Sequence, residues 1–137
     1  MNAIDEVKKL DLPAGEYLVC GSGIMSALGI RECSDIDLLV TPSLFEELKR
    51  RGWDYHEVEI DGRSRPKLTY GPAEAYTELW YGNERVPGDA LIAEAEIIDG
   101  VPFQPLHELL KMKRAMNREK DRRDIESIEK YLADRAK

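Results

Sequence analysis

The chain has 137 residues, of which 42% are hydrophobic and 34% are charged, and its formal net charge is −7. This length allows one domain with a sizeable core, over 1–137, and excludes two comfortable domains. The net negative charge argues against bulk, sequence-independent attraction to nucleic acid. No apolar run is long enough for a transmembrane helix, and the N-terminus lacks the layout of a secretory signal, so a cytoplasmic protein without membrane attachment is expected.

Local patterns in the first third of the chain predict helices that alternate with strands. The predicted elements are a helix over 2–10, a strand over 16–20, a helix over 22–28 and a strand over 35–40. Thr41 and Pro42 then fit the N-cap and the first turn of a further helix.

The pattern changes after Gly52. It predicts strands over 55–60 and 66–70 around an Asp61-Gly62 turn signal, one period-two strand over 74–81, a short helix over 89–96, a small hairpin over 97–103, and two final helices over 105–116 and 120–136. This order of elements predicts an α/β (α+β) fold, with helices flanking one mixed sheet of four or five strands.

Two acids open the predicted strand over 35–40. Residues two apart in a strand point to the same side, so Asp35 and Asp37 would project together. Such carboxylates repel unless a cation lies between them, and Mg²⁺ prefers carboxylate oxygen. The alternative is that both acids cap the following region or lie on an exposed edge.

A small-residue turn, Gly21-Ser22, lies between the predicted strand over 16–20 and the helix that follows it. Free backbone N–H groups at such a turn form an anion site, and the Ser22 hydroxyl can donate to a phosphate oxygen. No Gly-Lys-Ser/Thr sequence is present, so the turn is not a Walker loop. Together with the paired acids, it predicts a site for a metal-bound nucleoside triphosphate.

Basic residues gather between 111 and 123, against only Glu119 and Asp121. They are Lys111, Lys113, Arg114, Arg118, Lys120, Arg122 and Arg123. A local cationic surface on an acidic protein suits a compact polyanion such as a nucleoside triphosphate, and the alternative is a solvated helix face.

Two of these motifs carry a family resemblance. Gly21-Ser22, twelve residues, then Asp35-Ile36-Asp37-Leu38 resembles the signature of the DNA polymerase β-like nucleotidyltransferase superfamily. The segments 109–113 and 118–125 resemble the C-terminal part of small bacterial members, which have a Leu-rich helix with Lys and then Arg-x-Lys-Asp-x-x-Asp-Ile. The resemblance implies a nucleotidyltransferase fold with C-terminal helices.

The resemblance also implies an activity: transfer of a nucleoside monophosphate from a nucleoside triphosphate to an acceptor hydroxyl, with two Mg²⁺ ions at the α-phosphate. Asp35 and Asp37 would be catalytic metal ligands. The nucleotide-binding residues would be Gly21, Ser22, Lys113, Arg118 and Lys120.

The family requires a third acid on a neighbouring strand. Glu78 is the prediction, as a charge in the middle of the 74–81 strand with apolar neighbours, and Glu74 on the same face is the nearest rival.

Different functions remain compatible with these motifs. The acceptor of an active enzyme would be a small molecule such as an aminoglycoside-type antibiotic, a protein or a tRNA. A catalytically silent nucleotide-binding or regulatory module, acting through a partner protein, is the second hypothesis. Larger relatives hold the acceptor with an added helical domain, so here a homodimer mate, a partner or a shallow cleft would serve. An unrelated acidic domain with coincidental motifs is the third.

Overall fold

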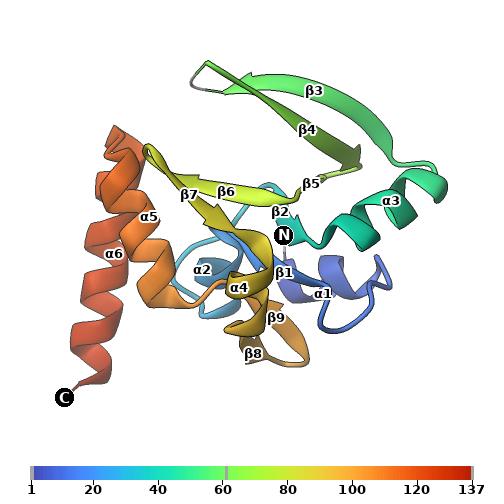
Figure 1. The fold of residues 1–137 in the computed structure, drawn as a ribbon. Coiled ribbons are helices and arrows are strands. Elements are labelled where there is room, and N and C mark those ends of the chain that lie inside the picture. The colour runs from blue at the N-terminus through green and yellow to red at the C-terminus, as the bar shows by residue number, and fades with distance from the viewer. Residues whose placement is uncertain (1, 61, 137) are drawn as a thin grey trace.

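A computed structural model describes residues 2–60 and 62–136 and shows an α+β fold (Figure 1). Its helices are α1 Ala3–Lys8, α2 Gly23–Ala27, α3 Pro42–Arg50, α4 Gly88–Ala93, α5 Leu106–Met116 and α6 Glu119–Arg135. Its strands are β1 Tyr17–Cys20, β2 Ile36–Val40, β3 Asp54–Ile60, β4 Arg63–Tyr70, β5 Ala73–Tyr76, β6 Glu78–Tyr81, β7 Glu84–Pro87, β8 Glu96–Ile98 and β9 Val101–Phe103. No helix in this part of the chain has both the length and the apolar character needed to cross a membrane.

The strands form two sheets. Seven of them make one mixed sheet in the order β3-β4-β5-β2-β1-β9-β8, and β6 pairs with β7 in a separate two-stranded sheet. The α+β class is confirmed, but the predicted sheet of four or five strands was too small. The difference arises because the 54–70 hairpin and the 96–103 hairpin both join the central strands as edge extensions.

The two faces of the large sheet bury different clusters. Ile36, Leu38 and Val40 lie in the larger core with residues of α1, α2, α3, α5 and α6. Leu18, Cys20 and Leu39 lie in a smaller cluster with residues of β6 and α4. Asp37 follows the same alternation as Leu39, so its side chain belongs to the face that β6 and α4 cover.

Most predicted elements are confirmed with shifts of one or two residues at their ends. Thr41 caps α3 as expected, because its hydroxyl accepts a hydrogen bond from the Leu44 N–H at 3.2 Å. The predicted turn at Asp61-Gly62 falls partly outside the described residues, but β3 and β4 pair directly on either side of it, from Ile60 and Arg63 onward.

The single strand predicted over 74–81 was wrong. The chain forms β5, leaves the large sheet at Thr77, and then forms β6 in the second sheet, where Glu78 pairs with Pro87. Both halves alternate with period two, so the sequence pattern did not show the change of partner. The register of β5 on β2, which pairs Asp37 with Glu74, determines which acid lies beside Asp37.

The start of α2 is tightly packed at Gly23. A methyl group added there would lie 2.3 Å from Val19 Cγ1, and Val19 is fully buried. We expect Gly23→Ala to destabilise the fold by about 1–3 kcal/mol, because overpacking exceeds the gain in helix propensity. Urea denaturation measures the free energy of unfolding. Val19→Ala removes the side-chain atom that the added methyl group meets. The double variant should therefore lose less unfolding free energy than the two single variants lose in total, and simple additivity of the two losses would contradict the assigned contact.

Candidate functional site

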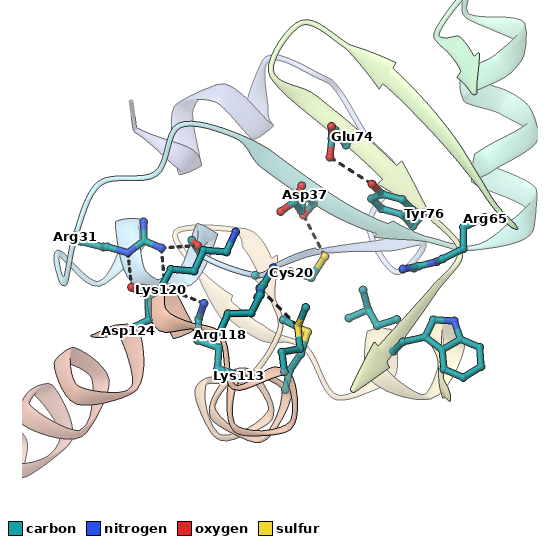
Figure 2. A pocket seen from close by; sticks show the side chains of 16 residues that line it. Cys20, Arg31, Asp37, Arg65, Glu74, Tyr76, Lys113, Arg118, Lys120 and Asp124 are labelled. Atoms are coloured by element: carbon teal, nitrogen blue, oxygen red, sulfur yellow. Dashed lines mark hydrogen bonds and ion pairs between the residues drawn. The ribbon is translucent and has the colours of Figure 1, made fainter. Parts of the chain in front are cut away.

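Asp37 lies at the centre of the candidate site, on β2. Its Cα is in register with Cys20 on β1 and with Glu74 on the parallel strand β5. Paired residues on adjacent strands share a face, so the Asp37 and Glu74 carboxylates lie on the same side of the sheet, and both line one pocket (Figure 2).

Burial and neighbouring charge perturb the Asp37 carboxyl. Burial makes the largest contribution and the negative charges of Glu74 and Asp35 add to it; together they raise the pKa of Asp37 to about 6. Glu74 is itself held by Lys67, whose Nζ lies 3.1 Å from Glu74 Oε1, and by the Tyr76 hydroxyl, which donates to Oε2 at 3.4 Å. Two adjacent carboxylates with one raised pKa provide hard oxygen donors that suit a divalent cation.

The Gly21-Ser22 turn lies directly against Asp37. Gly21 has a φ of +66°, and a Cβ at this position would lie 3.3 Å from Asp37 Oδ2, so both the backbone conformation and the space favour glycine. Ser22 Oγ accepts a hydrogen bond from Arg31 Nη2 at 2.8 Å. The turn and the acid therefore form one wall of the pocket.

Gln104 accepts a hydrogen bond from the Gly21 N–H, a group that the sequence had suggested as a free hydrogen-bond donor to phosphate. The N–H donates to Gln104 Oε1 at 3.0 Å, and the fully buried Gln104 donates through Nε2 to the Tyr81 hydroxyl at 3.0 Å. Tyr81 donates in turn to Glu108 at 2.9 Å. This series of hydrogen bonds holds the Gly21-Ser22 turn in place. Sequence reasoning missed it, and its only signal was a polar residue directly after an apolar strand.

The basic side chains form the opposite wall, and carboxylates of α6 hold three of them. Arg31 makes a bidentate pair with Asp124, with both N···O distances 2.8 Å. The buried Lys113 lies 2.8 Å from Asp124 and 3.5 Å from Asp121, and Arg118 pairs with Asp121 at 2.6 Å. Burial alone would raise the pKa of Asp124, but hydrogen bonds from Arg31 and Lys113 outweigh it and lower the pKa to about 2.

The pocket between these walls has a volume of about 340 Å³. Six of the predicted site residues line it: Gly21, Ser22, Asp37, Lys113, Arg118 and Lys120. Two do not. Asp35 is exposed, immediately before β2, and acts on Asp37 through its charge. Across residues 2–60 and 62–136, no group of three or more His, Cys, Asp or Glu side chains is arranged to hold a metal ion.

The structure does not bring Glu78, the predicted third acid, into the lining of the pocket. The break at Thr77 places it on β6, where it forms an ion pair with Arg85 and accepts a hydrogen bond from Trp80 Nε1 at 3.3 Å. Burial by itself would raise the pKa of Glu78, but the hydrogen bonds from Arg85 and Trp80 lower it. Glu74, the rival, lies opposite Asp37 instead.

The pocket continues beyond Asp37 to a third wall. Arg65 of β4, Tyr76 of β5, and Leu79 and Trp80 of β6 line it. The Arg65 guanidinium carbon lies 5.0 Å from the centroid of the Tyr76 ring. This wall combines a cation with flat and apolar surfaces.

Comparison with protein-family models, curated proteins and solved structures gave no match to the chain.

The raised pKa of Asp37 predicts a specific pH dependence of stability. The carboxyl titrates near its ordinary value of 3.8 in the unfolded chain and near 6 in the folded chain, so between these values the folded state binds the proton more strongly. Raising the pH from about 4 to about 7 should therefore cost the wild type about 2 kcal/mol of stability relative to Asp37→Asn, which cannot titrate. Urea unfolding of both proteins at a series of pH values measures this difference. Asp124 does not interfere with this measurement, because its own effect on stability changes between pH values of about 2 and 4. Parallel curves of unfolding free energy against pH for the wild type and Asp37→Asn would contradict the raised pKa of Asp37.

Proposed function

We propose that the chain is a nucleotidyltransferase, which binds a nucleoside triphosphate with Mg²⁺ and transfers the nucleoside monophosphate to an acceptor hydroxyl. The observation that carries the proposal is the position of the Asp37 and Glu74 carboxylates. They lie beside the Gly21-Ser22 turn and across one pocket from Lys113, Arg118 and Lys120. The family resemblance of the two sequence motifs supports the same activity, and a cytoplasmic location stays a prediction.

The acidic side of the pocket suits the metal. Asp37 and Glu74 would hold Mg²⁺, with Asp35 at the edge of the site, and nucleotide phosphates and water would complete the coordination. The bound ion would stabilise negative charge at the α-phosphate and lower the pKa of the attacking hydroxyl. Proximity of two carboxylates, unfavourable by itself, then becomes a source of affinity for a divalent cation.

The basic side suits the leaving group. The acceptor oxygen bonds to the α-phosphorus, the bond from this phosphorus to the bridging oxygen breaks, and pyrophosphate departs with the electron pair. The acceptor proton passes to the Glu74 carboxylate. Lys113, Arg118 and Lys120 face the position where negative charge develops, and the Asp121 and Asp124 contacts hold two of these cations in place before the nucleotide binds.

A catalytically silent nucleotide-binding module is the second candidate. One observation favours it: Lys113, Arg118 and Arg31 are already paired with carboxylates, which reduces the net positive charge available to pyrophosphate. Such a module would bind the Mg²⁺–nucleotide complex and act through a partner protein without turnover.

The pair of glutamates provides a matched test. With Mg²⁺ and labelled nucleoside triphosphates, Asp37→Asn and Glu74→Gln should each lower label transfer or pyrophosphate release by about 100-fold or more, because each removes a group that stabilises the transition state. Glu78→Gln should retain activity, since Glu78 lies outside the pocket lining. Equal losses in Glu74→Gln and Glu78→Gln would contradict the assignment of the third acid.

Binding measurements separate the two candidates even when the acceptor is missing. Calorimetry with and without Mg²⁺ should show metal-dependent nucleotide affinity in the wild type, and Asp37→Asn should lose the metal dependence. Metal-dependent binding without turnover of any acceptor class would favour the silent module, and absence of nucleotide binding would contradict both.

A further inference from the structure

The third wall of the pocket lies across Asp37 from the basic side chains. Figure 2 shows Arg65 and Tyr76 on one side of Asp37, and Lys113 and Lys120 on the other. A group bound at the third wall therefore approaches Asp37 from the side away from these cations.

The reaction of the proposed function, on which this inference rests, assigns each side of the pocket to one reactant. In phosphoryl transfer the attacking and leaving oxygens lie roughly in line on opposite sides of the phosphorus. Pyrophosphate that leaves toward Lys113, Arg118 and Lys120 therefore requires the acceptor hydroxyl to enter from the side of the third wall. The nucleoside is bonded through an oxygen that is equatorial to this line, so it extends away from the α-phosphate sideways.

Glu74, the proposed proton acceptor, adjoins the third wall. It is in register with Asp37, and its Oε2 accepts a hydrogen bond from the Tyr76 hydroxyl at 3.4 Å. Tyr76 belongs to the third wall, and the centroid of its ring lies 5.0 Å from the Arg65 guanidinium carbon. A hydroxyl compound bound at this wall would thus place its O–H beside the carboxylate that takes the proton.

Arg65 is the cation of the third wall, and it differs from the cations across the pocket. Its Nη2 donates to the Glu78 backbone carbonyl at 2.6 Å, which fixes the guanidinium without neutralising it. No carboxylate of the described residues forms an ion pair with Arg65, whereas Lys113 and Arg118 each have an aspartate partner. A bound anion would therefore meet a positive charge that is not already paired.

The Arg65 Nε–H is buried and, in the part of the chain that the structure describes, has no hydrogen-bond partner. Buried donors are nearly always satisfied, because leaving one unpaired forfeits its hydration without compensation. Arg65 lines the pocket, so an oxygen of a bound ligand can supply the missing acceptor. A carboxylate oxygen suits this donor best, because hydrogen bonds between two charged groups are about twice as strong as neutral ones.

Charge and surface restrict the class of acceptor. An amino group, as on an aminoglycoside-type acceptor, would meet the like charge of Arg65. A polyanion such as RNA is disfavoured by the net charge of −7, whereas one carboxylate balances one guanidinium. Leu79 and Trp80 provide apolar and aromatic surface for the carbon skeleton between the carboxylate and the hydroxyl.

We propose that the wall formed by Arg65, Tyr76, Leu79 and Trp80 is the acceptor subsite, and that the acceptor is a hydroxy acid. Its carboxylate pairs with Arg65 and its hydroxyl lies beside Glu74. The product is a phosphodiester between the hydroxy acid and the nucleoside, formed as the hydroxyl proton passes to Glu74 and pyrophosphate leaves.

A matched series of benzyl alcohols tests the subsite. At the para position, para-(hydroxymethyl)benzoate carries a carboxylate, para-(hydroxymethyl)benzamide a neutral amide and para-(hydroxymethyl)benzylamine a cation. Calorimetry measures their binding to the wild type with Mg²⁺ and nucleoside triphosphate analogues whose oxygen between the α- and β-phosphates is replaced by methylene, so that no transfer occurs. The benzoate should bind about tenfold or more tightly than the amide, because its hydrogen bond to Arg65 is charge-assisted, and the amine should bind most weakly.

Substitution of Arg65 should remove this order without disturbing the nucleotide. Arg65→Gln should weaken benzoate binding by about tenfold or more and bring the three affinities within about threefold of one another. The Kd of the nucleotide without acceptor should change by less than about threefold, which also shows that the variant is folded. Arg65→Lys keeps the charge and should retain a preference for the benzoate over the amine.

Arg63→Gln is the matched control. Arg63 lies on the same face of β4, also over an aromatic ring, with its guanidinium carbon 3.8 Å from the Trp80 centroid, but it does not line the pocket. This variant should retain the wild-type order of affinities.

The failures of the two proposals are distinguishable. If the wild type binds no nucleotide with Mg²⁺, the proposed function and the acceptor subsite both fall. If nucleotide binds in a metal-dependent way, the subsite alone is overturned by absence of benzoate binding, by equal affinities, by a preference for the amine, or by an order that Arg65→Gln leaves intact. A tenfold loss of nucleotide affinity in Arg65→Gln without acceptor would assign the wall to the nucleotide and would also overturn it.

Discussion

The parallel pairing of β2 with β5 is the constraint on which the site depends. It places Asp37 and Glu74 in register on one face of the sheet, where burial raises the pKa of Asp37 and the charge of Glu74 raises it further. Two carboxylates in this position are unfavourable without a cation, and the positive charge of Lys67, which pairs with Glu74, partly compensates them. The fold keeps them at the end of the face where β6 and α4 cover Leu18 and Leu39, so the acids lie at the margin of a buried cluster and face the pocket.

The C-terminal helices bring their own counter-charges. Lys113 on α5 is buried, and a buried ammonium is stable only when it is paired; Asp121 and Asp124 on α6 provide that pairing and hold Arg118 and Arg31 as well. The result is a basic wall whose side chains are already oriented. Preorganisation of this kind reduces the cost of ordering long side chains around a phosphate, although it also reduces the net charge that the phosphate meets.

Much of the fold could be predicted from local signals. The cap of α3, the strand that contains Asp37, and the two final helices each have a signature within a few residues, and these elements are present. The sheet order could not be predicted, because pairing depends on which apolar faces meet after the chain has folded. Gln104 and Arg65 could not be predicted as site residues for the same reason, because each reaches the site from a strand or turn distant in sequence, whereas Glu74 was named from the sequence only as the rival of Glu78.

The register of β5 on β2 accounts for the position of Glu78 away from Asp37, and the break at Thr77 explains the form of the pocket. Even in one continuous strand, Glu78 would lie about 13 Å from Glu74, since each residue advances about 3.3 Å, so only one of the two acids can oppose Asp37. By leaving the large sheet, the chain instead carries β6 over Leu18 and Leu39, and Leu79 and Trp80 then form a wall of the pocket. The Glu78 backbone carbonyl fixes Arg65 within that wall. The residue predicted to act through its carboxylate therefore contributes to the site through its main chain, an effect that no side-chain motif can reveal.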